Sequence, residues 1–457
     1  MKPADFFAQL KLHASTARQP ALITPECEYS YGSLLSAVQQ QAQHLQDEKC
    51  ALLLPQSDNR AETVITDLAA LWAGVVHVPL PTFFSPAQKA FVEHALLGSG
   101  TPLSIPANTA KITFTSGTTG TPKGVCLSAE ALLSVAQSIA SATEGLSIER
   151  HLSALPYAVL LENIAGLYAP LWRGVTCVVL PMQLVGLSGS SQFDARILHE
   201  QVERYQASSL ILLPQMLRAW SMSLAAQQLS TPRCLELVAV GGAAAGVRLL
   251  AQARALGIPA YEGYGLSEGA SVQTLNLPGA DRPGSVGRPL PHTQVRVADD
   301  GEIEIRGALF SGYVQDPERP VPEWWPTGDL GVLDADGYLH IQGRKKNVLI
   351  TAYGRNVSPE WVEITLKSEP AIAQAVVFGN DQPALSAVLW PLQPTTTDAA
   401  LEAAVQAANA YLPDYARIAH WVRADLAFSA DTGLATANGR PVRERIEATY
   451  LPHGELV

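Results

Sequence analysis

Helical and strand-like hydrophobic patterns alternate along the first third of the chain. Apolar residues recur at helical spacing over residues 31–45 and 61–72, whereas residues 50–54 and 74–80 are short apolar runs. Three further apolar runs, with helical patterns near them, lie between residues 175 and 240. Strands separated by helices require crossover connections, which predict a mostly parallel sheet with both faces covered. We therefore expect an α/β fold with a large body of layered α/β subdomains.

The pattern changes after about residue 284. Short alternating strands separated by Asp-Gly turns lie between residues 294 and 342, and they predict an antiparallel sheet or a small β-barrel-like subdomain. The remaining quarter of the chain mixes helical and strand patterns. We place a boundary at residues 343–346, which divides the chain into an N-terminal domain of residues 1–343 and a small α+β domain of residues 344–457.

The composition excludes several classes of protein. The 457 residues include 31 basic and 42 acidic ones, giving a net charge of −11 without a basic block, so we expect no nucleic-acid partner. The five cysteines are scattered and lack the spacing of a zinc site. No apolar run approaches the ~18 residues of a membrane span, and no secretory signal is visible. We expect a cytoplasmic protein, and its oligomeric state stays open.

A segment rich in glycine, serine and threonine, SGTTGTPKG, follows a strand-like stretch at residues 112–114. Its glycines permit unusual backbone conformations, and its hydroxyl and N–H groups can surround phosphate oxygens. Lys123 adds a mobile positive charge. The segment is not a Walker A loop, because Pro122 stands where that motif has glycine before lysine. The hydroxyl groups are those of Ser116, Thr118, Thr119 and Thr121, and the ATP or AMP contacts expected in this segment are Thr115, Ser116, Gly117, Thr118, Thr119 and Gly120.

TSGTTGTPKG resembles the phosphate loop of the adenylate-forming superfamily, which contains acyl-CoA synthetases, luciferases and peptide-synthetase adenylation domains. YEGYGLSE at residues 261–268 resembles its adenine and metal motif, and WPTGDL at residues 325–330 resembles its ribose motif. GRKKNVLITAYGRNVSP at residues 343–359 resembles its hinge and thioester loop, and RPGSVGRPL at residues 282–290 its connecting segment. The resemblance covers about residues 20–450.

The resemblance implies roles for the residues in these motifs. Glu268 is the implied Mg²⁺ ligand, beside Ser267 where threonine is commoner in the family. Tyr264 is expected against adenine, Asp329 at the ribose hydroxyls, and Arg344 at the ribose or a phosphate. The full set of ATP or AMP contacts beyond the phosphate loop is Gly242, Ala243, Glu262, Gly263, Tyr264, Gly265, Ser267, Asp329 and Arg344. The implied catalytic residues are Lys123, Glu268 and Arg440.

Members of the superfamily have a mobile C-terminal domain that swings between two poses, and the resemblance places the pivot at Lys346 or Lys345. Arg440 stands where the family has a lysine that reaches the forming acyl-phosphate bond. Arginine keeps the charge but is a planar fork rather than a compact ammonium. Three interpretations stay open: Arg440 supports slower adenylation, the second domain is specialised for another task, or another cation serves.

The acyl and thiol sites are implied by further matches. Residues 154–166 resemble the fatty-acyl branch, with Val159 at a position where histidine is common. Tyr157, Val159 and Gly241 are expected at the acyl pocket or thiol tunnel. Gly354 matches the glycine that lets a pantetheine arm pass, and Glu162 is expected to have a structural role or to face the phosphate loop. An α-amino acid substrate is disfavoured, because no Phe-Asp pair stands in the relevant segments.

These observations predict an AMP-forming carboxylic acid ligase. ATP and Mg²⁺ would activate a hydrophobic fatty or aryl acid to an acyl-adenylate, and a thiol, CoA in the leading interpretation, would take the acyl group. One alternative is a stand-alone adenylation enzyme that loads the phosphopantetheine of a carrier protein. A second alternative, motivated by Arg440, is a weakened adenylate-binding protein. The sequence does not name the acid.

Overall fold

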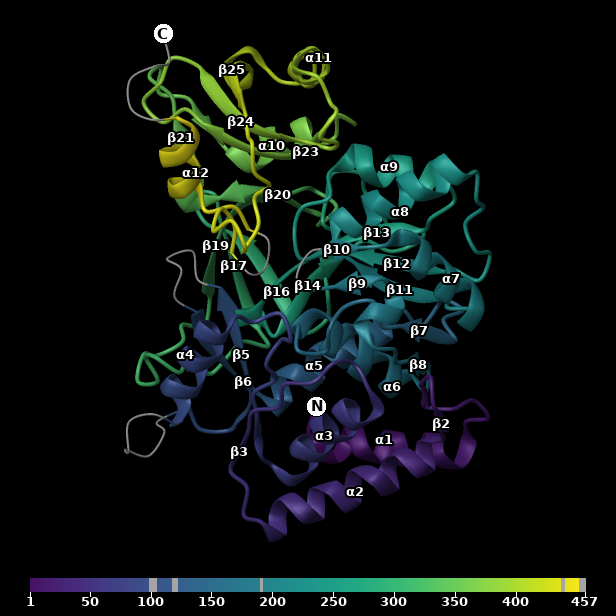
Figure 1. The fold of residues 1–457 in the computed structure, drawn as a ribbon. Coiled ribbons are helices and arrows are strands. Elements are labelled where there is room, and N and C mark those ends of the chain that lie inside the picture. Colours follow the sequence, from purple (N-terminus) through teal and green to yellow (C-terminus); the bar gives the residue numbers. More distant parts are fainter. Residues whose placement is uncertain (98–104, 117–121, 190–191, 437–439, 452–457) are drawn as a thin grey trace.

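The computed structural model describes residues 1–97, 105–116, 122–189, 192–436 and 440–451. Its largest sheet has nine strands, and its order interleaves early and late segments of the chain (Figure 1). In that order the strands are β15 (Arg288–Pro289), β14 (Ser271–Leu275), β13 (Ala260–Leu266), β12 (Leu237–Val240), β11 (Ser209–Leu212), β7 (Arg150–Leu152), β8 (Thr176–Val178), β1 (Leu22–Ile23) and β2 (Glu28–Tyr29). The six from β13 to β1 are parallel, which confirms the α/β expectation, and antiparallel strands flank them.

Two groups of helices pack on this sheet with separate apolar clusters. The first group, α7 (Ala195–Tyr205), α8 (Pro214–Gln227) and α9 (Val247–Ala255), packs through residues such as Trp220, which is fully buried. The second cluster joins α5 (Ala129–Ala142), the π-helix η1 (Glu162–Tyr168) and α6 (Ala169–Arg173) with the N-terminal helices. Those helices are α1 (Pro3–Thr16), α2 (Tyr31–Asp47) and α3 (Ala61–Ala73), the purple elements of Figure 1.

A second sheet carries the segment that enters the phosphate loop. Its order is β18 (Gly312–Tyr313), β6 (Pro122–Ser128), β5 (Thr109–Ser116), β4 (Val76–His77) and β3 (Leu52–Leu53), and α4 (Pro86–Leu97) lies close by. A buried polar cluster supports β5, because Lys111 Nζ lies 2.7 Å from Asp67 Oδ2 and 2.5 Å from Asn163 Oδ1. Ion pairing of this kind compensates the cost of burying both charges.

The predicted antiparallel region is a four-stranded sheet. Its strands are β16 (Thr293–Val297), β17 (Glu302–Gly307), β19 (Trp325–Leu333) and β20 (Leu339–Arg344), paired in that order. The strand direction is as expected, but the described strands form an open sheet rather than a closed barrel, because no pairing joins β16 to β20. Short elements elsewhere in the large body are η2 (Met182–Val185), β9 (Leu187–Ser188), β10 (Gln192–Phe193) and η3 (Ser267–Gly269), and η4 (Lys345–Asn347) follows β20.

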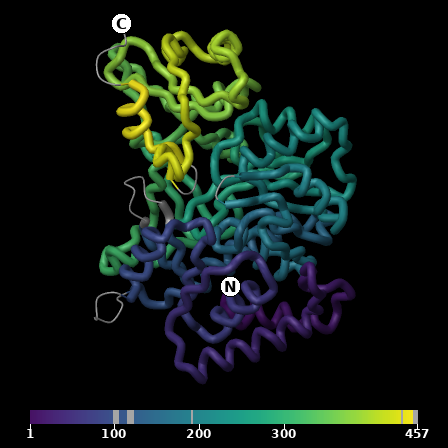
Figure 2. Tube along the Cα trace, in the orientation of Figure 1, coloured from purple at the N-terminus to yellow at the C-terminus, as the bar shows by residue number. Residues whose placement is uncertain are grey.

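The last part of the chain has its own apolar clusters, which draw only on residues after 348. A three-stranded sheet of β23 (Ile372–Phe378), β24 (Leu385–Pro391) and β25 (Ile418–Arg423) packs with α10 (Pro359–Lys367) and α11 (Asp398–Asn409). The other elements are β21 (Leu349–Ile350), β22 (Asn356–Val357), η5 (Asp414–Ala416) and α12 (Arg443–Tyr450). Figure 2 shows the yellow segment before α12 descending toward the green strands of the four-stranded sheet.

Two arginines of the large body hold this last part of the chain. Arg248 on α9 forms an ion pair with Glu369, and Arg218 on α8 donates to the Glu369 carbonyl oxygen at 2.9 Å. Lys345 Nζ lies 2.6 Å from Asp300 Oδ2 and 2.7 Å from Glu302 Oε2.

Within the described ranges, no helix combines the length and the apolar character needed to cross a membrane.

Candidate active site

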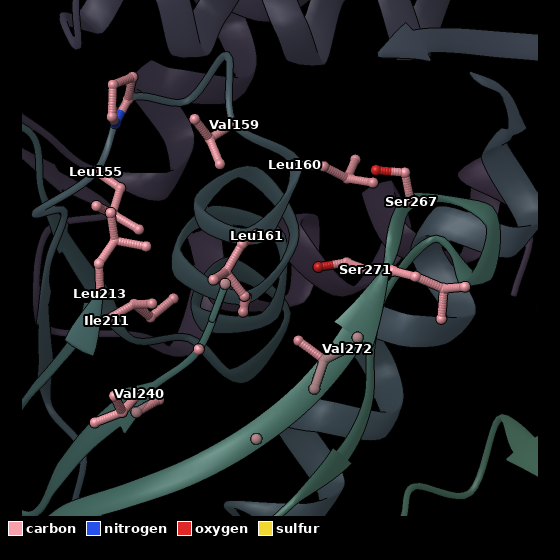
Figure 3. Close-up of a pocket in the computed structure, with 18 of the residues that line it drawn as sticks. Leu155, Val159, Leu160, Leu161, Ile211, Leu213, Val240, Ser267, Ser271 and Val272 are labelled. Atoms are coloured by element: carbon pink, nitrogen blue, oxygen red, sulfur yellow. The ribbon is translucent and has the colours of Figure 1, made fainter. Parts of the chain in front are cut away.

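A cavity of about 620 Å³ lies between the nine-stranded sheet and the α5–η1–α6 layer. Figure 3 shows its apolar walls: Leu161 and Val159 belong to the segment that leads into η1, and Ile211 and Val240 belong to β11 and β12. Ser271 and Val272 of β14 lie on the opposite side, and Ser267 lies beside Leu160. An apolar cavity with a few polar groups is the usual form of a small-molecule site.

The three implied catalytic residues line this one cavity. Lys123 comes from β6, Glu268 from η3, and Arg440 from the segment before α12. Desolvation and the Arg344 cation lower the pKa of Arg440, while the carboxylates of Asp329 and Glu268 oppose that shift. Two cations and a carboxylate from distant parts of the sequence therefore converge where two anionic reactants could meet.

The structure describes only part of the predicted phosphate loop. Gly117, Thr118, Thr119, Gly120 and Thr121 lie outside the described residues. Thr115 and Ser116 are in β5, where their Cα atoms pair with those of Lys123 and Pro122 on β6. The loop therefore begins and ends at a β-hairpin whose second strand carries Lys123.

Glu268 is held by a tyrosine that the sequence did not point to. The Tyr313 hydroxyl group donates to Glu268 Oε1 at 2.8 Å, and Lys123 Nζ lies 5.3 Å from the Tyr313 ring centre. Tyr313 is on β18, which pairs with β6, so it reaches the site through strand pairing rather than through a motif. No group of three or more metal-binding side chains occurs among the residues that the structure describes. One carboxylate still fits Mg²⁺, which is often held by one or two carboxylates together with substrate phosphates and water.

The two residues predicted at the ribose, Asp329 and Arg344, lie together with Tyr264. Arg344 Nε lies 2.8 Å from Asp329 Oδ1, and the Tyr264 hydroxyl group donates to Asp329 Oδ2 at 2.6 Å. Asp329 is only 4% exposed. Burial raises the pKa of its carboxyl group, and Arg344 and the Tyr264 hydrogen bond partly offset that rise. Tyr264 and Arg344 line the cavity, whereas Asp329 lies immediately behind them.

Glycines form part of the wall, as expected. Gly241, Gly242, Gly263 and Gly265 all line the cavity. A Cβ atom on Gly265 would lie 2.0 Å from the Ser271 carbonyl oxygen, so the pairing of β13 with β14 excludes a side chain there. Gly242 has φ +79°, which favours glycine, and leaves this part of the wall without a side chain.

Besides Asp329 and the phosphate-loop residues of β5, five predicted residues do not line the cavity. Glu262 is buried and accepts a hydrogen bond from the Ala245 backbone N–H at 2.7 Å, so its side chain points away from the site. Tyr157 is also buried, and its hydroxyl group lies 2.6 Å from Ser153 Oγ. The other residues outside the lining are Ala243, Lys345 and Gly354.

Gly354 and the two hinge candidates differ in their surroundings. Gly354 has φ +68° and open space around its Cβ position, so in this arrangement a turn, rather than crowding, accounts for the glycine. Lys346 lines the cavity, whereas Lys345 does not and donates hydrogen bonds to the carboxylates of Asp300 and Glu302. Burial, Arg344 and Arg440 lower the pKa of Lys346. Lys346 is therefore a further cation of the site.

Two polar residues that the sequence did not single out also line the cavity. His151 on β7 and Ser209 on β11 have paired Cα atoms, and His151 Nδ1 lies 2.9 Å from Ser209 Oγ. His151 Nε2 lies 3.1 Å from Glu162 Oε1 on η1, and the Leu155 N–H donates to Glu162 Oε2 at 3.3 Å. Glu162 thus has a structural role toward His151. No spacing in the sequence links the three residues: strand register pairs His151 with Ser209, and the packing of η1 brings Glu162 to His151.

Comparisons with known proteins identify the family. Residues 95–314 match the model of the AMP-binding enzyme family, and residues 346–453 match that of the AMP-binding enzyme C-terminal domain. The long-chain-fatty-acid–CoA ligase FadD15 of Mycobacterium bovis is 42% identical over 154 residues, which are 33% of this chain and 26% of that protein. The 2-succinylbenzoate–CoA ligase of Bacillus velezensis is 31% identical over 60% of this chain and 57% of its own length.

Solved structures share the fold of nearly the whole chain. The anthranilate CoA ligase AuaEII, solved with anthranoyl-AMP, has a TM-score of 0.82 and 19% identity over 98% of this chain and 99% of its own. O-succinylbenzoate CoA synthetase from Bacillus subtilis, solved with an acyl-adenylate, has a TM-score of 0.78 and 24% identity over 96% and 97%. The chain spans 26% to 57% of the curated relatives named above. The two family matches together cover most of the chain and show that it belongs to the AMP-binding enzymes, and the solved structures show that it shares their fold.

Proposed function

We propose that this protein is an AMP-forming carboxylic acid ligase. The observation that carries the proposal is the convergence of Lys123, Glu268 and Arg440 on one cavity whose remaining lining is mostly apolar. Cations suit ATP and the carboxylate of an acid, and the apolar walls suit the rest of that acid. The two curated relatives named above are CoA ligases of long-chain fatty acids and of 2-succinylbenzoate, which supports a fatty or aryl substrate.

The first step would join the acid to AMP. A carboxylate oxygen attacks the α-phosphorus of ATP, the bond to the β-phosphate oxygen breaks, and pyrophosphate leaves. Negative charge grows on the phosphate oxygens, and Lys123 and Arg440 would stabilise it. Glu268, fixed by Tyr313, would hold Mg²⁺ against those oxygens. Asp329 would accept hydrogen bonds from the ribose hydroxyl groups, with Arg344 setting its orientation.

The second step would move the acyl group to a thiol. The thiolate attacks the acyl carbon, a thioester forms, and AMP leaves with its phosphate. CoA is the proposed acceptor, since several relatives are CoA ligases.

We further propose the domain boundary at residues 343–346, with reorientation about Lys345 and Lys346 between the steps. The five free cysteines fit the reducing cytoplasm, where we place the reaction.

Pyrophosphate exchange into ATP tests the first step. We expect exchange that depends on both Mg²⁺ and an added fatty or aryl acid, and a loss of about 100-fold or more in Glu268→Gln. An absence of exchange with every acid, in protein that still binds ATP, would refute the ligase proposal. Yields of acyl-CoA and of acylated carrier protein, measured side by side, then identify the acceptor.

A further inference from the structure

The cavity continues well beyond the region of the proposed nucleotide site. The Gly241 N–H donates to the Leu212 carbonyl oxygen, so Leu212 marks the level at which the glycine wall begins. Ser209 lies three residues earlier on the same strand and also lines the cavity. Three residues of a β-strand span roughly 10 Å. The cavity therefore reaches about 10 Å deeper than the glycine wall, which is roughly the length of an eight-carbon chain.

A polar cluster lies at the depth of Ser209, where apolar residues such as Leu210 and Leu237 also line the cavity. His151, Glu162 and Ser209 are all at least 95% buried, and a hydrogen-bonded chain joins them. Burying three polar side chains costs free energy that a wall of leucine would avoid. Gly166 faces the same pair, because a Cβ atom there would lie 2.1 Å from Glu162 Oε1 and 2.7 Å from His151 Nε2. The π-helix that presents Glu162 and Gly166 is a rare element, found most often at functional sites.

This chain of bonds leaves hydrogen-bonding capacity on Ser209. Glu162 uses one oxygen for His151 and the other for the Leu155 N–H, and His151 uses both ring nitrogens. The Ser209 hydroxyl group has one donor and two acceptor positions, of which His151 takes one. A ligand hydroxyl group can donate or accept, so it can bond to Ser209 whichever ring nitrogen of His151 carries the proton.

A second hydroxyl group lies in the same cavity wall. Ser271 Oγ is buried and has no hydrogen-bond partner among the described residues, and Figure 3 shows it beside the apolar wall residues. Ser271 also has φ +109°, a strained conformation for a residue with a side chain. Buried hydroxyl groups without partners are uncommon unless a ligand or water completes them.

From this geometry we infer that the acid carries a hydroxyl group on its acyl part, at the depth of Ser209, and is not a plain alkyl or phenyl acid. The inference rests on the proposed ligase activity and names its substrate class. Ser209 would bond to that hydroxyl group, and His151 and Glu162 would act as positioning residues that fix Ser209. Hydroxy fatty acids of medium length and phenolic acids are the two forms that meet this requirement.

Matched pairs of acids test the substrate class with the wild-type protein. Pyrophosphate exchange is measured with octanoic and 8-hydroxyoctanoic acids, and with 4-phenylbutanoic acid and its para-hydroxyphenyl analogue. We expect kcat/KM to be at least about tenfold higher for the hydroxylated member of at least one pair, the effect of roughly one well-placed hydrogen bond. Plain acids that equal or exceed both hydroxylated partners overturn the substrate class and leave the ligase proposal standing. Failure of every acid overturns the ligase proposal itself.

A variant then assigns the preference to Ser209. We expect Ser209→Ala to reduce the ratio of the two kcat/KM values at least about tenfold. Ser221→Ala is the matched control, because Ser221 is equally buried, lies on α8 and does not line the cavity. A ratio that is unchanged in Ser209→Ala overturns the assignment, and circular dichroism of both variants shows whether they are folded.

Discussion

Arg344 and Asp329 form an ion pair across two neighbouring strands, with Arg344 Nε 2.8 Å from Asp329 Oδ1 and their Cα atoms in register. The Tyr264 hydroxyl group occupies the other carboxylate oxygen. Three residues from three separate family motifs thus form one hydrogen-bonded unit beside the cavity. Because the Asp329 carboxyl group is already oriented, a nucleotide that binds there has less ordering to pay for.

Asp329→Asn tests this unit. The amide keeps the shape of the side chain but loses the charge that pairs with Arg344, and it is a weaker acceptor for ribose hydroxyl groups. We expect the KM for ATP in pyrophosphate exchange to rise about tenfold, with a smaller change in kcat. Tyr264→Phe is the control for the second hydrogen bond, and we expect about a threefold rise. An unchanged KM for ATP in Asp329→Asn would contradict the ribose role.

Substitutions at Arg440 distinguish an active ligase from a weakened adenylate-binding protein. Its place in the cavity with Lys123 and Glu268 favours an active role in adenylation. We expect Arg440→Ala to lower kcat for exchange about 100-fold and Arg440→Lys to keep most of the wild-type rate, because lysine preserves the charge. Stopped-flow or exchange kinetics measure both. A rate in Arg440→Lys that is at least ten times the wild-type rate would instead identify the natural protein as a weakened adenylate-binding protein.

The proposed hinge can be tested by comparing the two steps. Proline at position 346 restricts the backbone that must rotate, so we expect Lys346→Pro to slow thioester formation at least about tenfold more than pyrophosphate exchange. Lys346 also contributes charge to the cavity, and Lys346→Ala removes that charge without stiffening the backbone. Equal losses of the two activities in both variants would place the pivot elsewhere.

The motifs could be read from the sequence because each is a local property of a short stretch of chain. The strand patterns also predicted the parallel sheet, since buried strands need apolar runs. What the sequence left out depends on register between distant strands. Tyr313 reaches Glu268 because β18 pairs with β6, and Ser209 reaches His151 because β11 pairs with β7. Motif matches also do not tell which side chains face the cavity. Tyr157, predicted at its wall, is instead buried beside Ser153.

Glu262 also belongs to a matched motif but does not line the cavity, and its burial leads to a prediction about pH. Burial raises the pKa of its carboxyl group to about 7, and the Ala245 N–H opposes that rise. In the unfolded chain the group titrates near its ordinary value of about 4.3. The folded state therefore binds the proton more tightly, and this contribution to stability is present below about pH 4.3 and is lost as pH rises toward 7.

Glu262→Gln stays neutral at every pH and shows this loss by comparison. Urea unfolding at pH 5, 6, 7 and 8 measures the free energy of unfolding of both proteins. We expect the free energy of unfolding of the wild type to fall, relative to that of Glu262→Gln, by up to about 3 kcal/mol between pH 5 and 7. Above pH 7 the difference should level off. Glu93→Gln, an exposed substitution on α4, is the control and should follow the wild type. A constant difference across this range would contradict a raised pKa.

Gly166→Ala tests whether the His151–Glu162 pair is a rigid feature of the fold. The new methyl group would lie 2.1 Å from Glu162 Oε1, and both neighbouring side chains are buried and hydrogen-bonded, so neither can move freely. Overpacking of this kind costs about 1–3 kcal/mol. Alanine gains up to about 1 kcal/mol of helix propensity over glycine, so a net loss in urea unfolding demonstrates the clash. Gly145→Ala, with open space around its Cβ position, should change stability by less than about 0.5 kcal/mol. Equal stability of the two variants would mean that the pair yields easily and does not hold Ser209 in place.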